Sequence, residues 1–406
     1  MEEFKLTLEK VLIAQKRIQD LVHKTPLEFS RTLSNMAGIK TYLKEENLQR
    51  TGSFKIRGAL NKIRALDPIL LRKGVVAASA GNHAQGVSLA SSVVGVKAKV
   101  FMPLGTPPIK IEATKSYGAD VVLVGEDFEE AYDAAIQYCE KSGAVFIHPF
   151  DDEEVVAGQG TVALEILQDI SEFDAVLVPI GGGGLISGIG TVIKTVKPSV
   201  KVIGVQAKGA SSIYESFKQH KIIELSTTST FAEGIATKKP SKRILEYLES
   251  VVDDIVLVDD EEIAYSLLLL MERAKLVAEG AGAASLAAML FNKLASGIKQ
   301  AVCVISGGNI DLLTLDRVLE KGLKRAGRRH RIKIRLKDRP GELNKVLNVL
   351  AKNQINILSI DHDRLNYDVT IGMADVTLDI ETISMSQFSN TLDELKKLNL
   401  FVQEIP

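Results

Sequence analysis

The chain contains 406 residues, of which 46% are hydrophobic and 25% are charged, and this composition is typical of a globular protein. Its 50 basic and 51 acidic side chains give a formal net charge of −1, so it lacks the basic excess of many nucleic-acid-binding proteins. Two cysteines are too few for a disulfide framework, and no apolar run approaches the roughly 20 residues that cross a bilayer. We therefore expect a cytoplasmic protein with no nucleic-acid and no membrane partner.

Nine short apolar segments between residues 40 and 305 predict β-strands, and helical patterns separate most of them. One such pattern places Ile56, Leu60 and Ile63 on one helical face. Most of the apolar segments are continuous rather than alternating, which is typical of parallel strands covered on both faces. This order predicts an α/β fold with right-handed crossovers. The predicted strands are 41–46, 74–79, 98–102, 120–124, 144–147, 175–180, 201–206, 254–258 and 301–305.

The composition changes near residue 324, where a segment rich in Lys and Arg begins. We interpret residues 324–339 as a solvated linker and an edge strand, with nucleic-acid binding as the alternative. The following pattern of strand, helix, two strands, helix and strand is the ferredoxin-like βαββαβ order. The sequence thus predicts a larger domain at 1–325, a linker at 326–330 and a small domain at 331–406. The predicted elements of the small domain are strands 331–336, 355–363, 368–379 and 400–405 and helices 342–353 and 383–397.

Common nucleotide and metal motifs are absent from the sequence. No Gly-Lys dipeptide occurs, so there is no Walker A loop. The glycine run 181–188 does not fit the GxGxxG pattern of dinucleotide-binding folds. No zinc spacing of Cys and His is found, and we predict no metal site.

Residues 79–83, Ser-Ala-Gly-Asn-His, form the first of three turns that follow a predicted strand and open a helix. A doubly wound sheet binds its ligands at this edge, and free N–H groups in the first helical turn can hold a carboxylate. The alternative is an ordinary left-handed turn with Asn82 as a cap. We therefore treat this turn as a candidate carboxylate site.

A second turn holds four consecutive glycines, Gly181, Gly182, Gly183 and Gly184, ahead of Leu185. Each glycine costs about 0.5–1 kcal/mol of conformational entropy relative to Ala, which a simple connection does not need. Clustered N–H groups at a helix N-terminus suit a phosphate dianion. The turn therefore predicts a phosphate site, and a flexible connection is the alternative.

A third turn and one lysine complete the set of candidate residues. Ser306 follows the strand at 301–305, where its hydroxyl could reach a ligand ring or cap a turn. Lys55 follows a turn and Phe54 at the start of a helix; a buried amine there loses its charge and becomes a nucleophile. A phosphate cradle, a lysine and a ring partner together indicate pyridoxal 5'-phosphate.

The four segments also resemble those of threonine and serine dehydratases, in matching order. Residues 52–59, GSFKIRGA, resemble the cofactor-lysine segment, and 79–86, SAGNHAQG, the substrate-carboxylate loop. Residues 181–184 resemble the phosphate loop and 306–309, SGGN, the pyridine-nitrogen segment. The resemblance covers roughly residues 5–325. It implies the fold-type II architecture, with two open, mostly parallel sheets and a smaller mobile subdomain near 50–145.

The resemblance also implies roles for the residues. Lys55 would hold the cofactor covalently and then act as the catalytic base. The other cofactor contacts would be Phe54, Asn82, Gly181, Gly182, Gly183, Gly184, Leu185 and Ser306. The substrate contacts would be Ser79, Ala80, Gly81, Asn82, His83 and Glu279, and for Glu279 a helix-terminal surface carboxylate is an equal alternative.

The choice of reaction depends on two of these positions. Ser306 presents a neutral hydroxyl that cannot keep a ring nitrogen protonated, which favours elimination over transamination. Related serine racemases have a serine at the position of Ala80, and alanine cannot carry a proton. Gln206 and Ser212 stand where some relatives have acidic cation ligands, so a divalent site is not expected, and a weak monovalent ion held by backbone carbonyls is the alternative.

The remainder of the chain resembles an ACT domain, whose recognisable turn is DRPGEL at 338–343. The resemblance implies an amino-acid effector, isoleucine or valine, bound at a paired interface near Asp338, Arg339, Gly341 and Asn356, in a homotetramer or homodimer. The alternative is that this domain only mediates assembly. We expect L-threonine to give 2-oxobutanoate and ammonia, and L-serine to give pyruvate. A β-replacement enzyme of the cysteine synthase type and a non-catalytic amino-acid sensor are the alternatives.

Overall fold

The computed structural model describes residues 5–405 as two compact units, Met1–Asp311 and Leu312–Pro406. Each of the nine strands predicted before residue 310 is present, with ends shifted by at most two residues. The first unit contains the strands β1 (Leu27–Phe29), β2 (Lys40–Lys44), β3 (Val75–Ala78), β4 (Ala98–Met102), β5 (Asp120–Leu123), β6 (Val145–Phe146), β7 (Ala175–Pro179), β8 (Lys201–Ala207), β9 (Asp254–Val258) and β10 (Gln300–Val304).

The helices of the first unit separate these strands. They are α1 (Leu8–Ile18), α2 (Arg31–Ala37), α3 (Lys55–Ala65), α4 (Pro68–Leu71), α5 (Asn82–Val94), α6 (Pro108–Ser116), α7 (Phe128–Ser142), α8 (Glu153–Asp169), α9 (Gly184–Val196), α10 (Ser212–Gln219), α11 (Lys242–Val251), α12 (Asp260–Leu269) and α13 (Gly280–Leu290). Short 3₁₀ turns occur at η1 (Glu46–Leu48), η2 (Lys208–Ala210) and η3 (Glu233–Ile235), and a π-turn at η4 (Leu270–Ala274).

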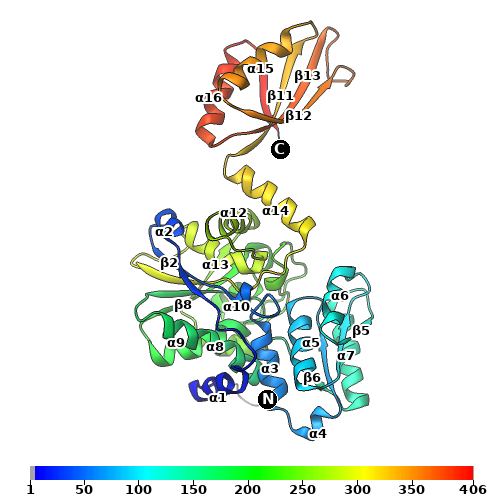
Figure 1. Ribbon diagram of the computed structural model, residues 1–406, viewed down its shortest axis with the longest axis vertical. Helices are drawn as coiled ribbons and strands as arrows, with labels where there is room; N and C mark the ends of the chain where they lie inside the picture. The colour runs from blue at the N-terminus through cyan, green and yellow to red at the C-terminus, as the bar shows by residue number, and fades with distance from the viewer. Residues whose placement is uncertain (1–4, 406) are drawn as a thin grey trace. The chain divides into compact units, whose positions relative to one another are not determined.

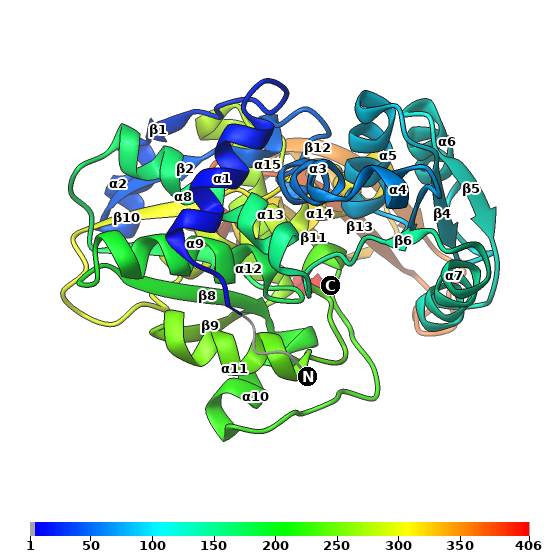
Figure 2. The same ribbon diagram turned by 90° about the horizontal axis from the view of Figure 1, so that it is seen from below.

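Two open sheets divide the first unit into a larger and a smaller lobe (Figure 2). The larger sheet has the order β1-β2-β10-β7-β8-β9 and is parallel except for the edge strand β1. The smaller sheet, β5-β4-β3-β6, is parallel throughout. The α/β architecture expected from continuous apolar strands is therefore confirmed. No strand was predicted at β1, because three residues carry too little pattern.

Helix α3 connects the two lobes. It packs against α5 of the smaller lobe and against α8, which in turn packs against α9 of the larger lobe. Its apolar residues Ile56, Leu60 and Ile63 lie in the core of the smaller lobe. Because α3 begins at Lys55, this packing holds the candidate cofactor lysine at the junction of the two lobes.

The second unit contains the predicted order of strand, helix, two strands, helix and strand, and it also includes Leu312–Arg325, which was predicted to belong to the larger domain. It consists of α14 (Leu312–Arg325), β11 (Arg329–Lys337), α15 (Glu342–Lys352), β12 (Asn356–Asp363), β13 (Met373–Glu381), α16 (Met385–Lys396) and β14 (Phe401–Ile405). The sheet is antiparallel in the order β12-β13-β11-β14, and α15 and α16 lie against it (Figure 1). Its buried apolar side chains form a core with these two helices. Among the described residues, no helix is both long and apolar enough to span a membrane.

Candidate active site

The candidate cofactor lysine begins helix α3. Lys55 is only partly exposed, and its Nζ donates a hydrogen bond to the carbonyl oxygen of Pro149 at 3.0 Å. Burial of the amine lowers the pKa of Lys55 to about 8, although the negative charge of Glu279 opposes this shift. The amine also lies 5.1 Å from the centroid of the Phe54 ring. Lys55 is therefore held inward and is partly unprotonated near neutral pH, as a nucleophilic amine requires.

The four glycines form the turn between β7 and α9. Gly183 has a φ of +91°, a conformation that side chains disfavour. A Cβ on Gly182 would lie 2.1 Å from Cδ1 of Phe150, so the ring of Phe150 lies directly against this turn. Helix α9 begins at Gly184, and the first N–H groups of a helix have no acceptor within it. The turn can therefore hold an anion at the N-terminus of α9.

The lysine and the glycine turn are brought together by residues 149 and 150. Pro149 accepts the hydrogen bond from Lys55, and the next residue, Phe150, packs against Gly182. Sequence reasoning missed both residues, because the segment after β6 carries no recognisable motif. An amine beside a set of free amide groups fits a ligand that has both an aldehyde and a phosphate.

Ser306 follows β10 and is 3% exposed. Its carbonyl oxygen accepts a hydrogen bond from the N–H of Phe54 at 3.2 Å, and Gly307 forms an antiparallel bridge with Ser53. The segment that carries the lysine is thus paired with the segment that carries Ser306. Lys55, predicted to hold the cofactor, and Ser306, predicted to contact its ring nitrogen, therefore lie on paired segments.

Asn82 and Glu279 also lie together. The Nδ2 group of Asn82 donates to Oε1 of Glu279 at 2.8 Å. Burial raises the pKa of Glu279 to about 7, and the hydrogen bond from Asn82 only partly opposes this. Glu279 is the N-cap of α13, but its carboxylate is buried, so the structure does not place it on the surface.

The candidate carboxylate turn lies between β3 and α5. The N–H of Gly81 donates to Oγ of Ser79 at 3.2 Å, while Ala80 packs against the core of the smaller lobe. His83 is buried, and its Nε2 lies 2.8 Å from the carbonyl oxygen of Ile147. Burial lowers the pKa of His83 to about 3, so its imidazole is neutral. Only the backbone N–H of His83 is suited to bind an anion.

The predicted effector residues do not come together within one chain. Asp338, Arg339 and Gly341 follow the C-terminal end of β11, whereas Asn356 begins β12. Asn356 pairs with Glu381, and Glu381 pairs with Arg329 at the opposite end of β11. The two parts of the prediction therefore lie at opposite ends of the sheet.

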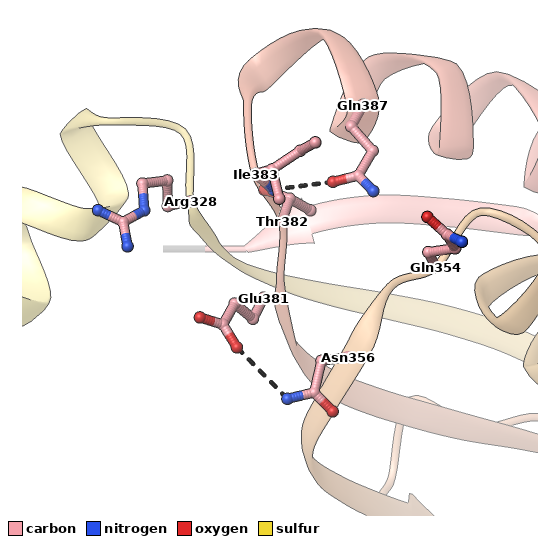
Figure 3. A pocket seen from close by; sticks show the side chains of 7 residues that line it. All are labelled: Arg328, Gln354, Asn356, Glu381, Thr382, Ile383 and Gln387. Atoms are coloured by element: carbon pink, nitrogen blue, oxygen red, sulfur yellow. Dashed lines mark hydrogen bonds between the residues drawn. The ribbon is translucent and has the colours of Figure 1, made fainter.

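Asn356 lines a pocket of about 450 Å³ at that end of the sheet (Figure 3). Its Nδ2 donates to Oε2 of Glu381 at 3.3 Å, and Gln387 accepts a hydrogen bond from the N–H of Ile383 at 2.8 Å. Ile383 is 83% exposed. The other lining residues are Arg328, Gln354 and Thr382. The lining is polar, with one basic and one acidic side chain, and this volume would admit a small zwitterion.

Comparison with known proteins identifies the class of protein to which the chain belongs. Residues 18–307 match the family model described as pyridoxal-phosphate dependent enzyme, and residues 330–398 match the ACT domain. The chain therefore belongs to the family of pyridoxal-phosphate dependent enzymes and carries an ACT domain, as the sequence resemblance implied.

Particular relatives are similar over most of the chain. An L-threonine ammonia-lyase of Thermotoga maritima is 48% identical over 93% of this chain and 94% of its own length. The structure of maize serine racemase is 37% identical, with a TM-score of 0.74 over 79% of this chain and 98% of its own. That of threonine deaminase isoform 2 from Solanum lycopersicum is 36% identical, with a TM-score of 0.73 over 79% and 95%.

Proposed function

We propose that this protein is an L-threonine ammonia-lyase, which converts L-threonine to 2-oxobutanoate and ammonia and also converts L-serine to pyruvate. The observation that carries the proposal is the Lys55 amine, bound at Pro149 beside the glycine turn, with its pKa lowered to about 8. The names of the similar ammonia-lyase and deaminase support the choice of substrate.

The residues of the site fit pyridoxal phosphate. When bound, this cofactor withdraws electrons from the substrate and so acidifies its Cα proton. Lys55 would bind it covalently beside Phe54, and the N–H groups of Gly181, Gly182, Gly183, Gly184 and Leu185 would hold its phosphate. Ser306 would donate to the ring nitrogen, and Asn82 would donate to the ring hydroxyl. Donation from a neutral serine favours elimination over transamination, and we expect Ser306→Asp to increase half-transamination.

The proton on the substrate Cα would be removed by Lys55. An amine with a pKa of about 8 is unprotonated in a useful fraction of molecules near neutral pH. The N–H groups of residues 79–83 would orient the substrate through its carboxylate, at the N-terminus of α5. Because Ala80 carries no proton, the opposite face of Cα has no acid there, which disfavours racemisation. This separates the proposal from a racemase, the activity named for the maize relative.

The ACT domain would bind an amino-acid effector and change the activity of the first unit. Feedback by isoleucine, opposed by valine, is the regulation that we propose, in a homo-oligomer of two or four chains. Such coupling requires that the effector bind two conformational states with different affinity.

The proposal is tested by measuring 2-oxo acid release from threonine and from serine, with and without isoleucine. Lys55→Ala should abolish turnover and the visible absorbance of the bound cofactor. Lys62→Ala is the matched control, because Lys62 lies on the same helix and forms a partly buried ion pair with Asp152, 2.6 Å away. Full turnover by Lys55→Ala would refute the proposed role of this lysine.

A further inference from the structure

Asn309 lies next to the candidate site but has no role in the scheme above. It follows the Ser306 turn, and its Nδ2 group donates to the carbonyl oxygen of Thr51 at 2.7 Å. The same group lies 2.8 Å from Oδ1 of Asn82 and 3.3 Å from Oε1 of Gln85. One amide of the larger lobe therefore contacts the lysine segment and two residues of α5.

The chemistry of these contacts fixes which way each amide faces. A backbone carbonyl such as that of Thr51 can only accept, so Asn309 must present its NH₂ group there. Asn82 must then present its oxygen to Asn309. Its own NH₂ group is left to donate, and it does so to Oε1 of Glu279 at 2.8 Å. The orientation of Asn82 thus follows from a carbonyl oxygen four residues before Lys55.

The packing around Asn309 supports a fixed orientation. Gly52 has a φ of +70°, and a Cβ at this position would lie 2.3 Å from Oδ1 of Asn309. The N–H of Gly308 donates to the carbonyl oxygen of Gly52 at 2.8 Å, which ties the two segments together. Asn309 itself is exposed, so replacing it leaves the hydrophobic core intact.

We propose that Asn309 is a positioning residue, which holds the Asn82 amide so that its NH₂ group donates into the active site. This rests on the proposed function, in which Asn82 donates to the cofactor. Because Asn82 belongs to the smaller lobe and Asn309 to the larger, this bond also joins the two lobes. The ionisable group bonded to Asn82 is Glu279, on which the charges of Glu233, Lys110 and Lys55 act.

The test is Asn309→Asp, which keeps the size of the side chain but replaces the donor with an acceptor. An ionised carboxylate at this position would face three oxygen acceptors, and we expect kcat/KM for threonine to fall about tenfold or more at pH 8. The protonated form of the same carboxyl group can donate again, so the deficit in kcat/KM relative to wild type should shrink as the pH falls toward the carboxyl pKa, which is about 4 for an exposed aspartate. Asn309→Ala should lose activity by the same factor at every pH, because it has no proton to regain.

Two further measurements separate positioning from general damage. Titration of the apo-protein with pyridoxal phosphate should give a dissociation constant raised about tenfold for Asn309→Asp at pH 8, with an unchanged Tm. The control is Asn61→Asp, because Asn61 donates to the carbonyl oxygen of Glu154 at 2.7 Å outside the site. This variant should lower the Tm, because its new carboxylate would repel that of Glu154, without raising the dissociation constant of the cofactor.

The outcomes are distinguishable. Equal deficits in kcat/KM for Asn309→Asp and Asn309→Ala at every pH, an equally raised cofactor dissociation constant in Asn61→Asp, or wild-type behaviour of Asn309→Asp would each overturn the role of Asn309. A wild-type protein without lyase activity would refute the proposed function instead. In that case the cofactor titration still tests Asn309.

Discussion

Replacing Arg57 with methionine should destabilise the first unit far more than a surface substitution on the same helix. Arg57 is 0% exposed and donates to both carboxylate oxygens of Glu46, at 2.8 Å each, and to both of Glu165, at 2.6 and 3.0 Å. The buried Lys44 donates to Glu165 at 2.6 Å. Two cations therefore balance two anions inside the protein, and Arg57→Met leaves two carboxylates with a single lysine.

The expected loss in free energy of unfolding follows from this charge imbalance. Removing one partner of a buried pair typically costs about 3–5 kcal/mol, because the remaining charge stays desolvated. An unfolding entropy of roughly 2.1 cal/mol/K per residue, applied to the 311 residues of the first unit, converts that loss to a Tm shift. The expected fall is about 5–8 °C. Methionine retains most of the apolar volume, so the loss is electrostatic rather than a cavity effect.

The assay is thermal unfolding of holoenzyme, with Arg64→Met as the matched control. Arg64 lies on the same helix and pairs with Asp20, which is 64% exposed in its side chain, so the control should cost less than about 1 kcal/mol. Equal Tm shifts for the two variants would refute the reasoning.

The same network also predicts how stability depends on pH. Burial alone would raise the pKa of Glu46, but Arg57 lowers it below the ordinary 4.5. The stabilisation is therefore present above pH 4.5 and is lost as the pH falls through the lower value of the folded state. Arg57→Met should remove this acid-dependent loss of stability, which is measured by unfolding at several pH values between 3 and 7.

Three other predictions concern single groups. Glu279→Gln should lower the pKa of Lys55 below about 8, because the carboxylate favours the ammonium form. The midpoint of amine labelling in the apo-protein should therefore shift to lower pH. An upward shift would contradict the assignment. Gly182→Ala should weaken cofactor binding at least tenfold, since its Cβ would meet Phe150 at 2.1 Å, and Phe150→Leu in the same chain should restore part of the affinity. Hydrogen bonds and charges from Arg335 and Lys333 lower the pKa of Asp375 to about 2. Asp375→Asn should therefore destabilise the second unit by about 1 kcal/mol at pH 7 but not near pH 2. An equal loss of stability at both pH values would rule out a charge effect.

Much of the fold could be predicted because its signals are local. Continuous apolar segments and the residues that break them depend on a few neighbouring positions, and nine strands of the first unit were found in this way. The glycine turn and Lys55 were also visible, since four glycines in succession and a lysine at a helix start are unusual in local sequence. The edge strand β1 was missed, because its three residues carry almost no pattern.

The sequence alone could not supply contacts between distant residues. It grouped Asp338 and Asn356 as effector contacts, and the antiparallel pairing of the sheet shows that they lie at opposite ends within one chain, so a shared site would need a second copy of the domain. It also left open whether Glu279 lies at the surface, because an N-cap position is compatible with either environment.

The sequence by itself determined the strands, the turns and the chemical groups that follow them. Only the tertiary structure decided which groups meet: Lys55 with Pro149, Asn309 with Asn82, and Arg57 with Glu165, which lies 108 residues away. The physical reason is that strand and turn formation are governed by short-range sterics and hydrophobic periodicity. Hydrogen-bond partners and shifted pKa values arise instead from burial and charge, which exist only once the lobes have packed.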